Sequence, residues 1–312
     1  MSNSTNAVLV FGAAGGVGRA AAMSASKRGA KVWLAMRNTS KPIPGQSEAD
    51  EKEAGFERVQ ADLKDLSSLK TAVEKSGATI AFVYCIPDSD DYMRSAFDTL
   101  KESGITDVVL LSSFLVSPTP EASKDLHFIT KFHAETEMQL RDSGLSYVAV
   151  RPAFFNSNMF WYLDGIKKGE VEIFGLEARQ DFIAPEDIGT VAGMLLATPS
   201  ARLAENGEKG KAIFLCGPKI MEVKEALGIV AEALGKEVKA KSLDEEEALK
   251  RMAHFPREFA ESIVASTKAN ILPRSYYTED RWRPAVENLR RYLGREPMSF
   301  GDWVQAHKEE FA

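Results

Sequence analysis

The stretch "VLVFGAAGGVGRA", Val8 to Ala20, is an apolar run that stops at a glycine and restarts as a helical pattern of small residues. Gly12, Gly15 and Gly18 lie in GxxGxxG spacing between the two parts, which predicts a strand, a tight turn and a helix. Glycine permits positive φ and close backbone approach, and the amides of a helix N-terminus favour negative charge. The turn is therefore predicted to bind a pyrophosphate, although a tight turn that only needs close packing would contain the same glycines.

Strand-like and helical segments alternate along the first half of the chain. The further apolar runs are "AKVWLAM" (30–36), "ATIAFVYC" (78–85), "TDVVLLSS" (106–113) and "LSYVAVRP" (145–152). Amphipathic helical patterns lie between them, the last over 123–144. This alternation predicts a parallel sheet covered on both faces. We expect an α/β, Rossmann-like, doubly wound domain over 1–152. A smaller, mainly helical substrate lobe is expected over 153–312, with the two lobes interleaved in one compact unit.

Composition argues against several classes of partner. The 312 residues are 44% hydrophobic and 27% charged, as in a globular protein, and the net charge of -6 comes without a Lys/Arg cluster. Neither nucleic acid nor a membrane surface is therefore an expected partner. No apolar run has the length of a membrane span, and no signal-like segment precedes Val8, so a cytoplasmic location is expected.

Cysteine and histidine usage gives no sign of a disulfide or a metal site. Cys85 and Cys216 both lie in apolar strand-like runs, which favours buried thiols over a disulfide. The four histidines show no metal-ligand spacing, so no metal is predicted.

The end of the second strand-like run indicates which nucleotide binds. An NAD-selective unit has an acidic residue there, whereas this run ends with Met36, Arg37 follows, and Lys41 comes four residues later. A guanidinium binds a 2′-phosphate through paired charge-assisted hydrogen bonds, so NADP(H) is predicted over NAD(H), unless Arg37 only faces solvent.

A second acidic position belongs to the same expected site. Asp62 could accept a hydrogen bond from the adenine amino group while Leu63 covers the ring. The alternative for Asp62 is a helix N-cap, a role that Asp65 fills as well or better.

Several motifs, in this order, resemble those of the NmrA-like proteins, an atypical branch of the short-chain dehydrogenase/reductase superfamily. They are "VFGAAGGVGRA", "AMRNTSK", "ADLKDLSSL", "VVLLSS", "TKFHAETEMQLRDSGLSYVAVRP" and "NSNM". The likeness covers Ala7 to Asn158 well and extends more weakly through "APEDIG" and the helical end. It implies a Rossmann-like fold and NADP(H) as the usual nucleotide. The family includes NADPH-dependent reductases of quinones, dyes and natural-product intermediates, and also proteins that only sense the nucleotide.

The catalytic pattern of the wider superfamily is incomplete. Its standard members use a tyrosine four residues before a lysine, and a serine after the fifth strand. Lys131, Ser112 and Ser113 occupy the corresponding places, but the tyrosine position holds His127. The resemblance implies that Lys131 fixes the nicotinamide ribose and that Ser112 or Ser113 binds the substrate oxygen. His127 is a candidate replacement acid, or merely a polar residue at a helix start, and His133 is a second candidate.

Both sets of ligand-binding residues are expected around one crevice at the carboxyl ends of the strands. The cofactor set is Gly12, Ala14, Gly15, Gly16, Val17, Gly18, Arg37, Lys41, Asp62, Leu63, Cys85, Ile86, Pro87, Ser112, Lys131, Pro152 and Phe154. The substrate set is Phe114, Phe155, Asn156, Asn158, Trp161 and Tyr162. Aromatic rings with a few amides suit a flat, largely apolar ligand, although Phe155 and Phe160 could equally belong to a core.

These patterns together predict an NADPH-dependent reductase of a hydrophobic, aromatic or conjugated carbonyl or quinone-like small molecule, acting as a monomer or homodimer. Two alternatives stay open. Loss of the tyrosine would also suit a non-catalytic NADP(H)-sensing regulator that binds a protein partner, and the same fold could carry a non-redox isomerase or cyclase.

Overall fold

The computed structural model describes residues 6–123, 126–202, 210–273 and 275–312. These residues form two compact units, each built from several chain segments. The first unit comprises Met1–Lys124, Lys131–Pro152 and Pro185–Phe214. The second comprises Asp125–Thr130, Ala153–Ala184 and Leu215–Ala312.

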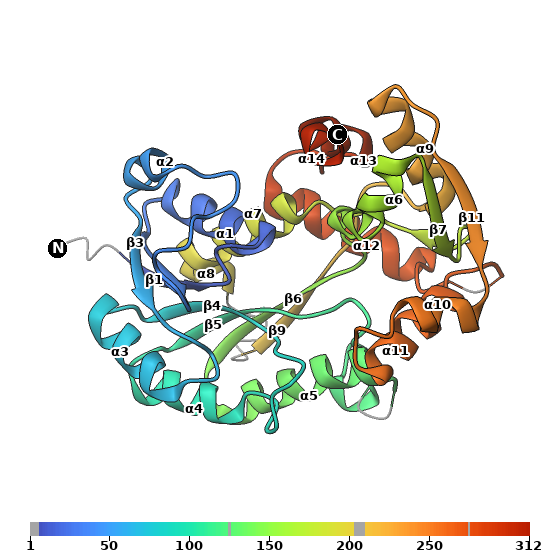
Figure 1. Ribbon diagram of the computed structural model, residues 1–312. Helices are drawn as coiled ribbons and strands as arrows, with labels where there is room; N and C mark the ends of the chain where they lie inside the picture. Colours follow the sequence, from blue (N-terminus) through green and yellow to red (C-terminus); the bar gives the residue numbers. More distant parts are fainter. Residues whose placement is uncertain (1–5, 124–125, 203–209, 274) are drawn as a thin grey trace. The chain divides into compact units, whose positions relative to one another are not determined.

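A seven-stranded sheet forms the centre of the first unit, in the order β3-β2-β1-β4-β5-β6-β9 (Figure 1). The strands are β1 (Ala7–Phe11), β2 (Lys31–Met36), β3 (Glu57–Gln60), β4 (Ile80–Tyr84), β5 (Asp107–Leu111), β6 (Ser146–Pro152) and β9 (Gly210–Leu215). All pairs from β3 to β6 are parallel, with Val8 of β1 opposite both Val32 and Ile80. The chain leaves β1 towards β2 and β3, then returns to β4 on the other side. This reversal is the switch point of a doubly wound sheet, so the predicted fold class is confirmed.

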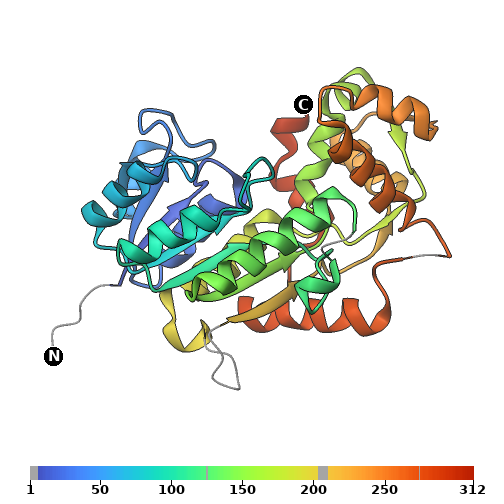
Figure 2. The same cartoon turned by 90° about the horizontal axis from the view of Figure 1, so that it is seen from below.

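Helices cover both faces of this sheet. Figure 1 shows α1 (Gly16–Ser26) and α7 (Pro185–Ala197) on one face. On the other face lie α3 (Leu66–Ser76), α4 (Arg94–Glu102) and α5 (Phe128–Ser143), of which α4 and α5 are seen across the sheet in Figure 2. The short elements are α2 (Glu48–Glu53), α8 (Pro199–Arg202) and the 3-10 helix η1 (Pro120–Ser123).

The start of α5 differs from the predicted helix over 123–144. The 3-10 helix η1 ends at Ser123 and α5 begins at Phe128. Residues 124–125 lie outside the described part of the chain. Thr130, Ala134 and Leu140 are buried along α5, and they supply the periodicity that predicted the helix.

The segment Pro185–Phe214 belongs to the first unit, although it follows residue 153 in the chain. Two glycines of α7 explain this placement. A Cβ atom at Gly189 would lie 2.4 Å from the carbonyl oxygen of Val17, and one at Gly193 would lie 2.4 Å from that of Ala21. Since any side chain would separate the helices, α7 is built to pack directly on α1.

The second unit is mainly helical. Its elements are η2 (Asn156–Tyr162), α6 (Leu163–Lys168), β7 (Glu170–Phe174), β8 (Arg179–Gln180), β10 (Met221–Glu222), α9 (Val223–Leu234), β11 (Lys239–Leu243), α10 (Glu245–Arg251), α11 (Arg257–Lys268), α12 (Glu279–Leu293), α13 (Phe300–Ala306) and α14 (Lys308–Phe311). β7 pairs with β11 in parallel, and β8 with β10 in antiparallel orientation. Phe160 packs its ring 5.4 Å from Trp303 and 4.8 Å from Phe311, so it belongs to the core of this unit.

Cys85 and Cys216 are buried free thiols, as predicted. Among the described residues, no helix has both the length and the apolar character needed to cross a membrane.

Candidate nucleotide-binding site

The glycine loop joins β1 to α1 in a compact turn. Gly12 has a φ of +71°, and the N–H of Gly15 donates to its carbonyl oxygen over 2.9 Å. A Cβ atom at Gly18 would lie 2.3 Å from the same oxygen, so only glycine allows the first turn of α1 to pack on the loop. The N-cap of α1 is Gly15, and no side chain caps this helix. An anion with oxygens placed like those of a pyrophosphate fits such a helix start.

The ends of four neighbouring strands meet around Tyr84. A Cβ atom at Gly12 would lie 3.1 Å from the Tyr84 ring, and the charges of Arg37 and Asp62 both act on its hydroxyl. Burial raises the pKa of Tyr84, and Arg37 opposes that shift. The structure therefore brings Gly12, Arg37 and Asp62 to one edge of the sheet, where the sequence predicted them.

The loop after β2 is held through its backbone, which leaves its basic side chains exposed. Arg58 of β3 donates to the carbonyl oxygens of Thr39 (2.6 Å) and Lys41 (3.0 Å), and its Nε donates to Glu51 over 2.8 Å. The Arg37 and Lys41 side chains are exposed, and neither has an ion pair within the described ranges. This loop thus presents two exposed positive charges, and paired positive charges suit a 2′-phosphate.

Asp62 is not the N-cap of α3. Asp65 takes that role and accepts from the N–H groups of Ser67 and Ser68. The Asp62 carboxylate accepts from the N–H of Lys64 over 3.0 Å and is half-buried at the sheet edge. Leu63 is buried in the first unit.

The remaining residues of the predicted cofactor set differ in exposure. On the glycine loop, Ala14 and Gly15 are exposed, Gly16 is half-buried and Val17 is buried. After β4, Cys85 and Ile86 are buried and Pro87 is exposed. The Cys85 thiol donates to the carbonyl oxygen of Leu111 over 3.4 Å, and burial raises its pKa well above the usual value, so the thiol stays neutral. Pro152 is buried at the end of β6, and its carbonyl oxygen accepts from the N–H of Phe114 over 2.9 Å.

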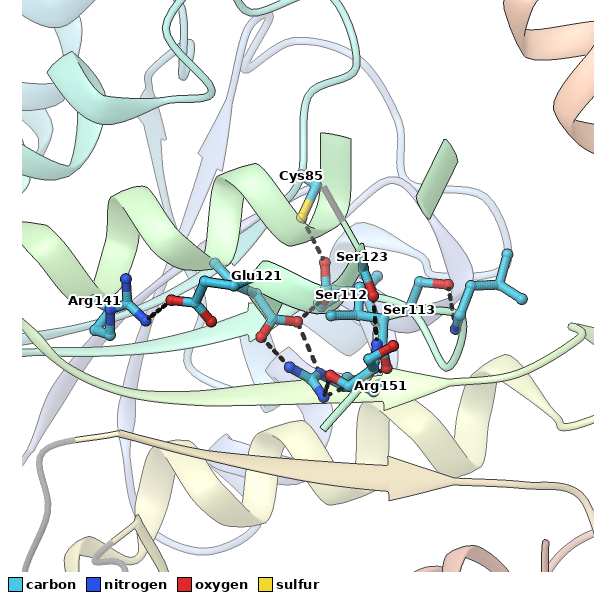
Figure 3. A network of polar contacts seen from close by, with 12 residues as sticks. Cys85, Ser112, Ser113, Glu121, Ser123, Arg141 and Arg151 are labelled. Atoms are coloured by element: carbon cyan, nitrogen blue, oxygen red, sulfur yellow. Dashed lines mark hydrogen bonds and ion pairs between the residues drawn. The ribbon is translucent and has the colours of Figure 1, made fainter. Parts of the chain in front are cut away.

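A buried ion pair joins Arg151 of β6 to Glu137 of α5, and Figure 3 shows Arg151 and Ser112 within this network of polar contacts. Arg151 donates from Nε to Oε1 of Glu137 over 2.9 Å and from Nη2 to Oε2 over 2.6 Å, and both residues are 1% exposed. Arg151 also donates to the carbonyl oxygen of Ser117 over 2.8 Å. The hydroxyl of Ser112 donates to the same Glu137 carboxylate over 2.5 Å. Ser112 is therefore part of this structural network, which corrects its prediction as a substrate-binding hydroxyl.

Ser113 is the serine with an accessible side chain. It is half-buried, and its hydroxyl oxygen accepts from the N–H of Leu115 over 3.2 Å, which leaves its proton for another acceptor. Phe114 is 2% exposed and packs edge-on against Phe214, with ring centroids 5.6 Å apart. It is a core residue of the first unit, which corrects its prediction as a substrate contact.

The predicted catalytic residues of α5 lie in different environments. Lys131 is exposed in the first turn of the helix. His127 precedes the helix, is half-buried, and has its Nδ1 3.4 Å from the Thr130 hydroxyl. Burial lowers its pKa, so the imidazole is neutral at pH 7 and is a weak proton donor. His133 stacks on Phe132, with ring centroids 4.0 Å apart.

The predicted substrate residues of the second unit follow β6. Trp161 is 57% exposed and meets Phe154 edge-on, with ring centroids 6.2 Å apart. Tyr162 packs on the core of this unit, and burial raises its pKa to about 12. Phe155 and Asn158 are half-buried.

Asn156 has a different environment from its neighbours. It is fully buried, and its backbone N–H donates to the carbonyl oxygen of Ile183 over 2.9 Å. Its side-chain amide has no hydrogen-bond partner among the residues described.

Sequence reasoning missed Glu137, although α5 carried a signal. Thr130, Ala134, Glu137 and Leu140 share the buried face of the helix, so the carboxylate interrupts an otherwise uncharged stripe. A charge on an apolar helix face needs a buried partner, which here is Arg151.

Comparisons with known proteins agree with this geometry. A family profile described as NAD(P)H-binding matches residues 12–192. The nitrogen metabolite regulation-like protein bik4 of Gibberella fujikuroi is 34% identical, with 96% of this chain and 95% of that protein covered. The (4-alkanoyl-5-oxo-2,5-dihydrofuran-3-yl)methyl phosphate reductase of Streptomyces griseus is 28% identical over 98% of this chain and 99% of that protein.

Solved structures show the same fold at lower identity. The NADPH-dependent quinone oxidoreductase QOR2 of Escherichia coli, complexed with NADPH, has a TM-score of 0.69 at 16% identity and covers 96% of this chain and 99% of that chain. NmrA, a negative transcriptional regulator, has a TM-score of 0.68 at 17% identity, with 98% of each chain covered.

Proposed function

Because this chain belongs to the NAD(P)H-binding, NmrA-like branch of the short-chain dehydrogenase/reductase superfamily, we propose that it is an NADPH-dependent reductase. Its substrate in this proposal is a hydrophobic small molecule with a conjugated or aromatic carbonyl group, of which a quinone is the simplest case. The chain's similarity to a furanyl phosphate reductase along nearly its whole length supports reductive chemistry.

The observation that carries the proposal is the meeting of Gly12, Arg37 and Asp62 at one edge of the sheet. The uncapped start of α1 would hold the pyrophosphate, and Arg37 with Lys41 would hold the 2′-phosphate. Asp62 would accept from the adenine amino group. This set of charges favours NADPH over NADH, since NADH lacks the 2′-phosphate that would pair with Arg37.

When bound, NADPH supplies a hydride. Lys131 would fix the nicotinamide ribose from the first turn of α5, and Ser113 would donate its free hydroxyl proton to the substrate oxygen. The protein in this account contributes position more than acid catalysis, because the usual tyrosine is absent. The neutral His127 is a poor replacement for it.

The weak acid assistance points to the substrate class. A simple ketone develops a localised negative charge on reduction and needs a strong proton donor, whereas a quinone or an enone delocalises that charge over its conjugated system. The exposed Trp161, edge-on to Phe154, offers a flat aromatic surface that suits such a ligand.

Replacing Lys131 by alanine tests this proposal. We expect the kcat for 1,4-naphthoquinone at saturating NADPH to fall roughly ten- to a hundredfold, since a lost positioning contact misaligns the reacting atoms. The assay follows NADPH oxidation at the nicotinamide absorbance, against enones and aromatic ketones as well. Lys167→Ala removes another exposed lysine, on α6, and should leave kcat unchanged. Equal kcat in both variants would contradict the role of Lys131.

A regulator that only senses the nucleotide is the second candidate. His127 in place of the tyrosine and the similarity to a nitrogen metabolite regulation-like protein favour it. Tight NADPH binding without NADPH oxidation across the acceptor panel would support this candidate instead.

A further inference from the structure

One carboxylate in the second unit collects hydrogen bonds from three separate chain segments. Asp181 is fully buried, and its Oδ1 accepts from the N–H of Phe154 over 2.8 Å. Its Oδ2 accepts from the N–H of Gly217 over 2.7 Å. The hydroxyl of Tyr277 donates to Oδ1 over 2.9 Å. A buried charge is tolerated when it is hydrogen-bonded this completely.

The backbone around Asp181 is held in one arrangement. A Cβ atom at Gly217 would lie 2.1 Å from the carbonyl oxygen of Asp181, so that close approach requires glycine. The next residue, Phe182, has a φ of +47°, a left-handed conformation that a bulky side chain rarely adopts. Strain of this kind persists only where the surroundings fix it, and it gathers at functional sites.

The same carboxylate aligns the loop after β6. The N–H of Ile183 donates to the carbonyl oxygen of Phe154 over 2.8 Å, and the N–H of Asn156 donates to that of Ile183 over 2.9 Å. Residues 154–156 therefore run beside residues 181–183. At the start of this pairing, the Asp181 side chain accepts the hydrogen bond from the N–H of Phe154. This segment overlaps the start of η2 at Asn156, and η2 also contains Trp161.

Tyr277 connects Asp181 to a second acceptor. Its hydroxyl lies 2.9 Å from Asp181 Oδ1 and 3.0 Å from Gln180 Oε1, and its single proton can serve only one of them at a time. Gln180 Oε1 also accepts from Nδ2 of Asn270 over 3.3 Å. When Asp181 is ionised, Tyr277 donates to it. When Asp181 is protonated, the new O–H can donate to Tyr277, which then donates to Gln180.

We propose that Asp181 is the positioning residue of the substrate-binding loop 154–158, and that its ionisation, supported by Tyr277, holds the loop in place. This inference rests on the proposed function only in taking that loop as the substrate-binding one. A charged acceptor forms hydrogen bonds about twice as strong as a neutral one, so protonation of Asp181 weakens its hold on Phe154 and Gly217.

The pH at which the hydrogen bonds from Phe154 and Gly217 to Asp181 weaken depends on the groups around this carboxylate. Burial raises its pKa to about 6, while the N–H groups of Gly217 and Phe154 and the hydroxyl of Tyr277 oppose that shift. The Cys216 thiol interacts with the carboxylate, and the charge of Arg281 of α12 acts on Cys216. The loop is therefore held firmly above pH 6 and loosens below it.

Overall stability changes in the opposite direction. Because the pKa of Asp181 in the folded protein lies above that of an aspartate in an unfolded chain, the folded state binds the proton more tightly than the unfolded chain does. Asp181 by itself thus lowers the free energy of unfolding as the pH rises from about 4 to about 6. Above pH 6 this contribution is constant.

Amide resonances of ¹⁵N-phenylalanine- and ¹⁵N-glycine-labelled protein test the proposal without any need for turnover. We expect the Phe154 and Gly217 amides to titrate together with a midpoint near pH 6. Tyr277→Phe should move that midpoint upward, because it removes a donor to the charged carboxylate. Tyr276→Phe alters the neighbouring tyrosine and should leave the midpoint in place. The proposal is overturned if neither amide titrates between pH 5 and 8, or if Tyr277→Phe leaves the midpoint unchanged.

A kinetic measurement distinguishes positioning from a merely structural role. The KM for 1,4-naphthoquinone should rise below the same midpoint while kcat changes little, and Tyr277→Phe should shift the onset of that rise. A pH-independent KM in a protein whose amides do titrate would contradict the positioning role. Absence of turnover at every pH would instead contradict the proposed reductase function and leave the amide titration as the test of Asp181.

Discussion

Arg37→Glu is expected to raise the Kd for NADPH about a hundredfold or more. In our account the guanidinium makes two charge-assisted hydrogen bonds to the 2′-phosphate, each worth about 1.5 kcal/mol or more, and about 3 kcal/mol corresponds to more than a hundredfold. The glutamate adds repulsion to that loss. NADH lacks the phosphate, so its Kd should change less than about threefold. Titration of nicotinamide fluorescence on binding measures both constants.

The control variant carries the same change in net charge. Lys52→Glu lies on α2, where the lysine is exposed, and should leave both constants close to their wild-type values. If Arg37→Glu weakened NADH and NADPH binding equally, Arg37 would not be the residue that binds the 2′-phosphate.

Glu137→Ala should lower the free energy of unfolding by about 3–5 kcal/mol, because it leaves the charge of Arg151 buried without its partner. Arg151 would retain only backbone carbonyl acceptors, and the Ser112 hydroxyl would lose its acceptor. Urea unfolding measures this loss. The slope m of the variant should equal that of the wild-type protein if both unfold in the same way.

Removing both charges distinguishes the destabilisation caused by an unpaired buried ion from the contribution of the ion pair to the free energy of unfolding. The double variant Glu137→Leu with Arg151→Met replaces the ion pair by apolar side chains and should be clearly more stable than Glu137→Ala. If the double variant were as unstable as the single one, packing rather than the unpaired charge would account for the loss.

Much of the first unit could be predicted because its signals are local. Parallel strands buried on both faces give continuous apolar runs, and the glycine loop leaves its spacing in the chain at Gly12, Gly15 and Gly18. Arg37 and Asp62 could be assigned to one site because parallel strands place their carboxyl ends at one edge. Asp65 as the cap of α3 follows from the same local reasoning.

What could not be predicted depends on contacts between distant residues. Tyr277 and Asp181 are 96 positions apart, and nothing in either neighbourhood identifies the other as its partner. Ser112 and Ser113 are adjacent and chemically alike, yet only the buried position of Glu137 assigns the first hydroxyl to the structural network. The return of Pro185–Phe214 to the first unit likewise depends on the packing of α7 on α1.

The most direct test of the account is single-turnover oxidation of NADPH by 1,4-naphthoquinone, with deuterium placed at one or the other face of the nicotinamide C4. If the protein is a reductase, one of the two labelled isomers will be oxidised more slowly than unlabelled NADPH, and the other will not. Saturable NADPH binding with no oxidation, or oxidation of unlabelled NADPH and of both labelled isomers at one rate, would contradict enzyme-directed hydride transfer.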